Sequence, residues 1–135
     1  MRPGSGCRER KAKTMKSQWI THKGVRILHL RYDHFGDDSS GLRMEVDESF
    51  DEVMKQPPNS VLELVDVTDT TGSGENVDIL RNAAAKCKTH IRMVAVIGIS
   101  GVRQLIVQGV ARITGMSFTL FDDVEKAKDW LAENK

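Results

Sequence analysis

A run of five apolar residues, 93–97, followed directly by Gly98, constrains the fold of this chain more than any other feature. The run does not alternate with polar residues, which is typical of a β-strand that is covered on both faces. Behind it come a turn with two glycines, an amphipathic helical pattern, a short apolar segment and a second helical pattern that ends near Trp130. This succession of strand, turn, helix and strand predicts a parallel α/β sheet.

The same patterns extend the prediction along the chain. Segments with the character of strands are residues 18–22, 25–32, 61–67, 92–99 and 118–120. Segments with helical spacing are residues 42–56, 77–87, 102–113 and 124–131. Lys23 and Gly24 predict a tight hairpin between the first two strands, and Pro57 with Pro58 forbids continuation of the first helix. The predicted fold is α/β, in the order ββαβαβαβα, with a mostly parallel mixed sheet and helices packed on it.

The length suits one domain, and the cysteines provide no disulfide framework. The chain has 135 residues, and its two cysteines, Cys7 and Cys87, do not form a spaced pattern, which suits a reducing compartment. The longest apolar stretch is far shorter than the roughly 20 residues that a bilayer-spanning helix needs. We therefore expect a cytoplasmic protein without membrane insertion.

Positive charge is concentrated at the start of the chain. Residues 1–16 carry a net charge of +5, so the total of +1 leaves −4 for residues 17–135. We expect residues 1–16 to be a disordered basic tail and residues 17–135 to be the folded domain. A mildly acidic domain argues against nucleic-acid binding. Met1 and Met15 are both compatible with the start of the natural chain.

Polar residues and glycines gather where two of the predicted parallel strands end. Open α/β sheets bind ligands outside the carboxyl ends of their strands, and helix N-termini at this edge attract anions. We therefore expect a rim that binds a partner or an anion. Its candidate residues are Asp66, Thr68, Asp69, Thr70, Thr71, Gly72, Ser73, Gly74, Gly98, Ser100 and Gly101.

Plainer interpretations of the rim are favoured at several positions. Threonine and serine commonly fill turns and cap helices, and Asp66 alone is better explained as a hydrogen-bond acceptor that orders its loop. The glycine-bearing turn at Gly98 has the spacing of neither a dinucleotide-binding fingerprint nor a phosphate-binding loop.

Short motifs along the chain resemble a known fold family. They are residues 20–24, 27–28, 57–62, 66–68, 95–101, 121–123 and 127–131. With the element order, they are similar to the STAS fold of anti-sigma-factor antagonists and to the uncharacterised bacterial SpoIIAA-like (STAS/SEC14-type) proteins. The resemblance implies one STAS-like domain that serves as a non-enzymatic, regulatory protein-interaction module.

Antagonists of this family are switched by phosphorylation in a D-S-S-G-type motif between the third strand and the second helix. Asp38-Ser39-Ser40-Gly41 matches by letters but precedes the first helix, so we interpret it as a capping loop. Thr70 and Thr71 lie in the correct loop and are the candidate phosphorylation sites. Their acidic neighbours disfavour added negative charge, so we expect no stable phosphate on either residue.

The remaining residues predict no catalytic, metal or cofactor site. The four histidines, His22, His29, His34 and His90, are scattered and are interpreted as surface residues. Cys87 falls on an apolar helical stripe and is interpreted as a buried small hydrophobe. Trp130 is interpreted as a core anchor. We expect no enzyme, no metal and no cofactor, because no nucleophile is paired with a base and no ligand spacing fits a metal.

Two rivals to the protein-interaction module stay open. One is a carrier or sensor of a small lipid-like or anionic ligand between the first two helices and the sheet. Met44, Met54, Met93 and Met116 are candidates to line such a pocket. A large pocket there would favour the carrier, whereas a filled core with an exposed apolar helix face would favour a protein partner or a homodimer. The other rival is an undetected small enzyme, which needs titratable groups that converge in one cleft.

Overall fold

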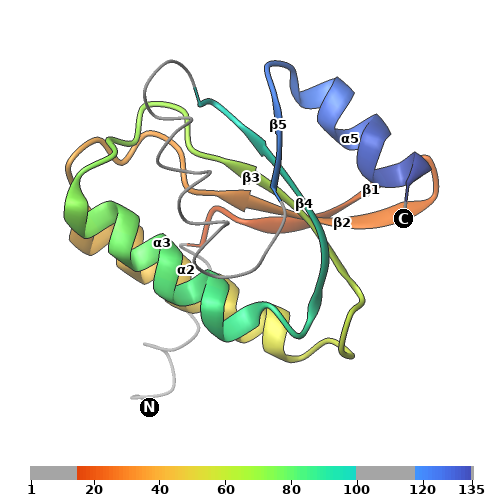
Figure 1. Cartoon of the computed structure of the whole chain (residues 1–135), viewed down its shortest axis with the longest axis horizontal. Coiled ribbons are helices and arrows are strands. Elements are labelled where there is room, and N and C mark those ends of the chain that lie inside the picture. The colour runs from red at the N-terminus through yellow and green to blue at the C-terminus, as the bar shows by residue number, and fades with distance from the viewer. Residues whose placement is uncertain (1–14, 100–117, 135) are drawn as a thin grey trace, which may run out of the picture.

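The computed structural model describes residues 15–99 and 118–134, which form a five-stranded sheet with helices on both faces (Figure 1). The strands are β1 (Gln18–His22), β2 (Val25–Arg31), β3 (Val61–Asp66), β4 (Ile91–Ile97) and β5 (Phe118–Phe121). The helices are α2 (Ser39–Met54), α3 (Gly74–Cys87) and α5 (Val124–Glu133). The predicted helix at 102–113 and most of the predicted tail at 1–16 lie outside the described residues.

The strands follow one another across the sheet in chain order, β1-β2-β3-β4-β5. β1 and β2 are antiparallel, and the other neighbouring pairs are parallel. Lys23 and Gly24, which join β1 to β2, both have positive φ angles, of 53° and 78°. Two such residues make the turn that best matches the twist of a hairpin. The predicted hairpin and the mostly parallel mixed sheet are therefore confirmed.

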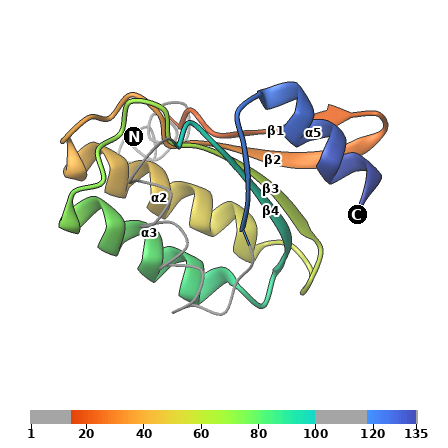
Figure 2. The same ribbon diagram turned by 45° about the horizontal axis from the view of Figure 1, so that its top comes forward.

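The helices divide the core into two layers (Figure 2). α2 and α3 lie side by side on one face of the sheet, and α5 lies on the other. Because side chains alternate along a strand, Leu28 and Leu30 of β2 pack in the cluster under α2 and α3, whereas Ile27 packs in the cluster under α5. β4 contributes side chains to both clusters as well. This burial on both faces explains its uninterrupted apolar run.

Local capping signals set the ends of the helices. The Asp38 side chain accepts a hydrogen bond from the Gly41 N–H at 3.0 Å and caps α2, which confirms the capping interpretation of the D-S-S-G string. α2 ends at Met54, two residues earlier than predicted. The cap of α5 is Asp123, which accepts from the Glu125 N–H at 2.8 Å. Asp122, which lies three residues before Glu125 and so predicts a capping box from the sequence, does not cap this helix.

The last helix is anchored by Leu131 more than by Trp130. Leu131 is completely buried under the sheet. The Trp130 ring lies 5.5 Å from that of Phe121, centroid to centroid, and packs against the same cluster while only partly buried. The interpretation of Trp130 as a core anchor is therefore corrected to that of a ring at the edge of the core.

Leu131→Ala should lower the free energy of unfolding by about 2 to 5 kcal/mol, because it leaves a cavity that the sheet cannot fill. Trp130→Ala should cost about 1 to 3 kcal/mol, because part of the ring is already in contact with water. Urea denaturation followed by circular dichroism measures both losses. A greater loss for Trp130→Ala than for Leu131→Ala would show that the ring is the main anchor.

Candidate functional site

The loop after β3 lies against the loop after β2 at the carboxyl edge of the sheet (Figure 1). The His34 N–H donates to the Thr68 carbonyl at 2.6 Å, and the Gly36 N–H donates to the Asp69 carbonyl at 2.8 Å. At the end of β3, one oxygen of Asp66 accepts from the Thr68 N–H at 2.9 Å and from the Thr68 hydroxyl at 2.7 Å. Asp66 thus orders its loop, as its plainer interpretation predicts.

The side-chain hydroxyl groups of the rim form hydrogen bonds that stabilise these loops. Thr70 is 2% exposed, and its hydroxyl donates to the Tyr32 carbonyl at 2.5 Å. Thr71 is exposed, and its hydroxyl lies 2.7 Å from an oxygen of Asp37. Ser73 caps α3 by accepting from the Asn76 N–H at 3.2 Å. Phosphorylation of Thr70 would first require this loop to open.

The other rim candidates have separate structural roles. Asp69 pairs with His34 at 3.0 Å, Gly74 is the first residue of α3, and Gly98 has a positive φ of 87° and lies against Thr68. Ser100 and Gly101 lie outside the described residues. The structure therefore places the described candidates at one edge of the sheet, in loops that are joined by hydrogen bonds.

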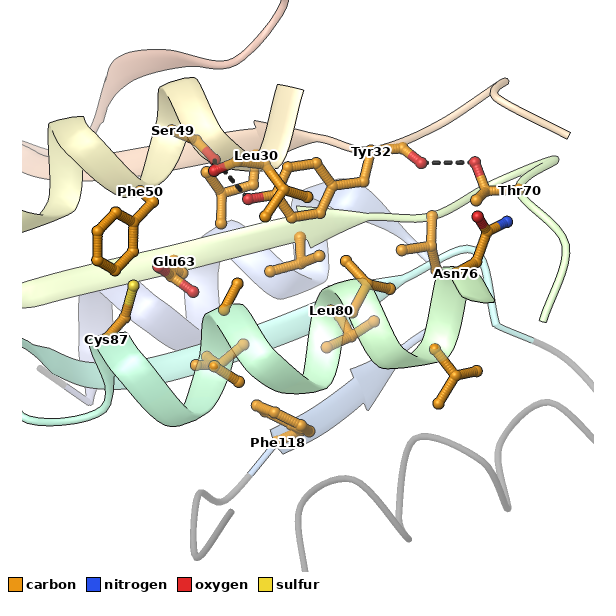
Figure 3. A pocket seen from close by; sticks show the side chains of 18 of the residues that line it. Leu30, Tyr32, Ser49, Phe50, Glu63, Thr70, Asn76, Leu80, Cys87 and Phe118 are labelled. Atoms are coloured by element: carbon orange, nitrogen blue, oxygen red, sulfur yellow. Dashed lines mark hydrogen bonds between the residues drawn. The ribbon is translucent and has the colours of Figure 1, made fainter. Parts of the chain in front are cut away.

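A cavity of about 130 Å³ lies between α2, α3 and the sheet (Figure 3). Leu30, Val65 and Val94 form part of its floor, and Phe50, Leu80 and Ala84 form part of its helical wall. The apolar character of this lining follows from the positions that these residues occupy on the inward faces of their elements. Gly72 is a rim residue that also lines the cavity, so the cavity extends to the rim.

One charged side chain, Glu63, stands in this apolar wall. It lies in the middle of β3, is 6% exposed, and is seen between Phe50 and Cys87 in Figure 3. No described residue forms a hydrogen bond or ion pair with its carboxyl group. Burial alone raises the pKa of Glu63 from 4.5 to about 8, because a charge without a partner is poorly solvated there.

Tyr32 and Ser49 form the second polar feature of the wall. Their oxygens lie 2.5 Å apart, and the Ser49 hydroxyl donates to the Val46 carbonyl at 3.0 Å. Since a serine hydroxyl has one hydrogen, both bonds form together only when Tyr32 donates to Ser49. The Tyr32 oxygen consequently keeps a lone pair that can accept from a ligand.

The ionisable groups of the wall are not activated for nucleophilic attack. Burial raises the pKa of the Cys87 thiol to about 12 and the pKa of Tyr32 well above its usual 10.0. Both groups are neutral at pH 7, and a thiol reacts through its thiolate. The interpretation of Cys87 as a buried side chain is confirmed. The wall is suited to holding a ligand rather than to attacking one.

Glu63 is the residue that the sequence predictions missed. Its signal is a single carboxylate inside the strand Val-Leu-Glu-Leu-Val, where a strand covered on both faces has no solvent for a charge. The predicted methionine lining was wrong for the described residues: Met44 and Met54 are 55% and 39% exposed, and Met93 packs on the opposite face of the sheet. Met116 lies outside the described residues.

Within the described ranges, 15–99 and 118–134, no group of three or more His, Cys, Asp or Glu side chains could hold a metal ion. No helix in those ranges is both long and apolar enough to span a bilayer.

The architecture is that of a SpoIIAA-like fold. The structure is similar to the crystal structure, at 2.25 Å resolution, of an uncharacterised protein of the DUF3478 family with a SpoIIAA-like fold from Shewanella loihica PV-4. The TM-score is 0.57 and the sequence identity is 18%, over 85% of this chain and 91% of the other. No family model and no curated protein matches the sequence. The likeness confirms the predicted fold.

Proposed function

We propose that this domain binds a small, largely apolar molecule in the cavity between α2, α3 and the sheet, as a carrier or sensor rather than as an enzyme. The observation that carries the proposal is an apolar cavity of about 130 Å³ with a buried carboxyl group that has no partner among the described residues. Small-molecule sites are typically concave and apolar, with a few polar groups that orient the ligand.

The unpaired carboxyl group supports binding more than a structural role. Buried polar side chains that serve only the fold are normally hydrogen-bonded, because an unsatisfied group costs free energy. Strongly shifted pKa values in a cavity are, in turn, a feature of functional sites. Glu63 meets both conditions and therefore supports a ligand that supplies the missing partner.

The volume of the cavity limits the size of the ligand body. A protein cavity of about 150 Å³ takes up benzene, so this cavity suits one ring or a short alkyl chain. A regulatory role through a protein partner, formation of a homodimer and a cytoplasmic location stay predictions from the sequence. They are compatible with a sensor whose ligand alters the rim through Gly72 and Thr71, which line the cavity.

A neutral probe of one ring, benzyl alcohol, should bind to the purified domain and perturb NMR signals of cavity residues such as Val46, Leu80 and Val94. Ala84→Leu should weaken this binding at least tenfold, because the added carbon atoms occupy the cavity. Titration followed by methyl and amide NMR spectra measures the affinity and the location together.

Ala85→Leu is the matched control, because Ala85 is the exposed neighbour on the same helix. It should bind benzyl alcohol as the wild-type protein does. Absence of binding at millimolar probe, or equal binding by the Ala84→Leu variant, would contradict the proposal.

A further inference from the structure

When Glu63 is ionised, the side chains of the cavity wall offer a ligand mainly hydrogen-bond acceptors. With both hydrogen bonds of Ser49 formed, Tyr32 donates to Ser49 and Ser49 donates to the Val46 carbonyl. What remains is the lone pair of Tyr32 and the carboxyl group of Glu63, which only accepts when it is ionised and donates one hydrogen when it is protonated. The Cys87 thiol is only a weak donor.

Asn76 at the cavity mouth offers no free donor either. Its amide nitrogen donates to the carbonyls of Gly36 and Thr71, at 3.2 and 2.9 Å, and its amide oxygen accepts from Ser39 at 2.7 Å. A ligand that binds the ionised form of Glu63 must therefore bring hydrogen-bond donors of its own.

The charge of the wall points to the same chemistry. Glu63 is its one acidic residue, and no lysine, arginine or histidine is among the described residues that line the cavity. The ionisable groups that face Glu63 are Tyr32, which follows β2 directly, and Cys87 at the end of α3. α2, β4 and β5 contribute none to the described lining. An anionic ligand would meet the like charge of ionised Glu63 without a compensating base, whereas a cation would meet its counter-ion in a medium that screens weakly.

We propose that the ligand is a small apolar amine, whose ammonium group is held by the Glu63 carboxylate and the Tyr32 oxygen while its hydrocarbon body fills the space between α2, α3 and the sheet. This inference rests on the proposed function, because it requires the cavity to bind a small molecule. It names the chemical class of that molecule and favours a cation over the anionic ligand that the sequence left open.

Binding of an ammonium group should also depend on pH, because Glu63 must lose its proton to pair with the ligand. In the empty domain the carboxyl group of Glu63, with a pKa of about 8, is mostly protonated at pH 7. The ammonium ion pairs with the ionised form, so the proton of Glu63 is released to solvent as the ligand binds. The apparent affinity for an amine should therefore rise about tenfold per pH unit between pH 6 and 7 and level off above pH 8.

The test compares three one-ring probes of similar size that differ in charge: benzylamine, benzyl alcohol and benzoate. Isothermal titration calorimetry of the full chain at pH 8 should show benzylamine at least tenfold tighter than benzyl alcohol, and no detectable binding of benzoate. Titrations of benzylamine at pH 7 in two buffers of different ionisation enthalpy should show close to one proton released per ligand.

Two substitutions of glutamate assign the effect to the carboxyl group. Glu63→Gln keeps the shape of the side chain and should bring benzylamine to the affinity of benzyl alcohol, with proton release abolished. Glu133→Gln removes an exposed carboxylate on α5, across the sheet, and should leave both properties as in the wild-type protein. Circular dichroism establishes that each variant is folded.

The outcomes separate this inference from the function on which it rests. If benzyl alcohol binds and benzylamine binds no better, the amine is excluded while the binding function stands. If Glu63→Gln retains the preference for benzylamine, Glu63 is not the counter-ion and the inference is wrong. If none of the three probes binds, both the inference and the proposed function are overturned.

Discussion

Glu63→Gln should raise the free energy of unfolding of the empty domain by about 3 kcal/mol at pH 7, an unusually large gain for one substitution. The reason is the shift of the carboxyl pKa from 4.5 to about 8 on folding. The wild-type carboxylate must take up a proton on folding at pH 7, whereas glutamine fills the same space and cannot ionise, so the variant avoids that cost. Urea denaturation at several pH values measures the gain.

The raised pKa of Glu63 also predicts how the stability of the domain changes with pH. A carboxyl group whose pKa is raised by folding contributes its full stability below its unfolded pKa, and that contribution is lost as the pH rises through the folded pKa. The wild-type domain should therefore lose stability between about pH 5 and pH 8 relative to the Glu63→Gln variant. Glu133→Gln should change little, because exposed substitutions usually do. A less stable Glu63→Gln variant at pH 7 would mean that the carboxylate has a stabilising partner in the folded domain.

Gly98→Ala should lower the free energy of unfolding by about 3 to 5 kcal/mol, because two costs combine at this residue. Its φ of 87° is a conformation that other residues adopt with strain. A Cβ atom there would also lie 2.5 Å from the Thr68 nitrogen and in contact with the Thr68 hydroxyl. The backbone of the rim loop would have to move to make room.

Gly74→Ala is the matched control for this prediction, since both glycines lie on the rim. A Cβ atom at Gly74 meets nothing within 4 Å, and alanine is well tolerated in a first helical turn. Its effect should stay within about 0.5 kcal/mol. Thermal unfolding compares the two variants, and amide NMR shifts of residues 66–70 should move for Gly98→Ala alone. Equal stability of the Gly98→Ala and Gly74→Ala variants would show that the rim loop accommodates a Cβ atom at residue 98 without loss of stability.

An unpaired carboxyl group that weakens the empty domain is consistent with a binding site. Stability and function often compete at sites that must receive a ligand, because the ligand supplies the interactions that the free protein lacks. An amine that binds to the folded domain should therefore stabilise it, and by more at pH 8 than at pH 6. The rim loop takes no direct part in this proposal; its hydroxyl groups hold the mouth of the cavity in place.

Most of the fold was predictable because its signals are local. The apolar run before Gly98, the positive-φ hairpin at Lys23 and Gly24, and the prolines after α2 each act within a few residues. The ends of elements have equally local causes. α5 begins at Val124, as predicted, because the side chain of Asp123 accepts a hydrogen bond from the Glu125 N–H.

The site was less predictable, because its properties depend on distant parts of the chain. Residues 61–67 alone determine that β3 is an apolar strand with one carboxylate, and the inward side of Glu63 follows from alternation. Whether that carboxylate meets water, a base or a void is decided by how α2 and α3 pack over β2, β3 and β4. The sequence by itself thus determined the strands, the turns and the chemical identity of Glu63. Only the tertiary structure decided that Glu63 is desolvated beside an unfilled apolar space, because packing across the sheet leaves that space unoccupied.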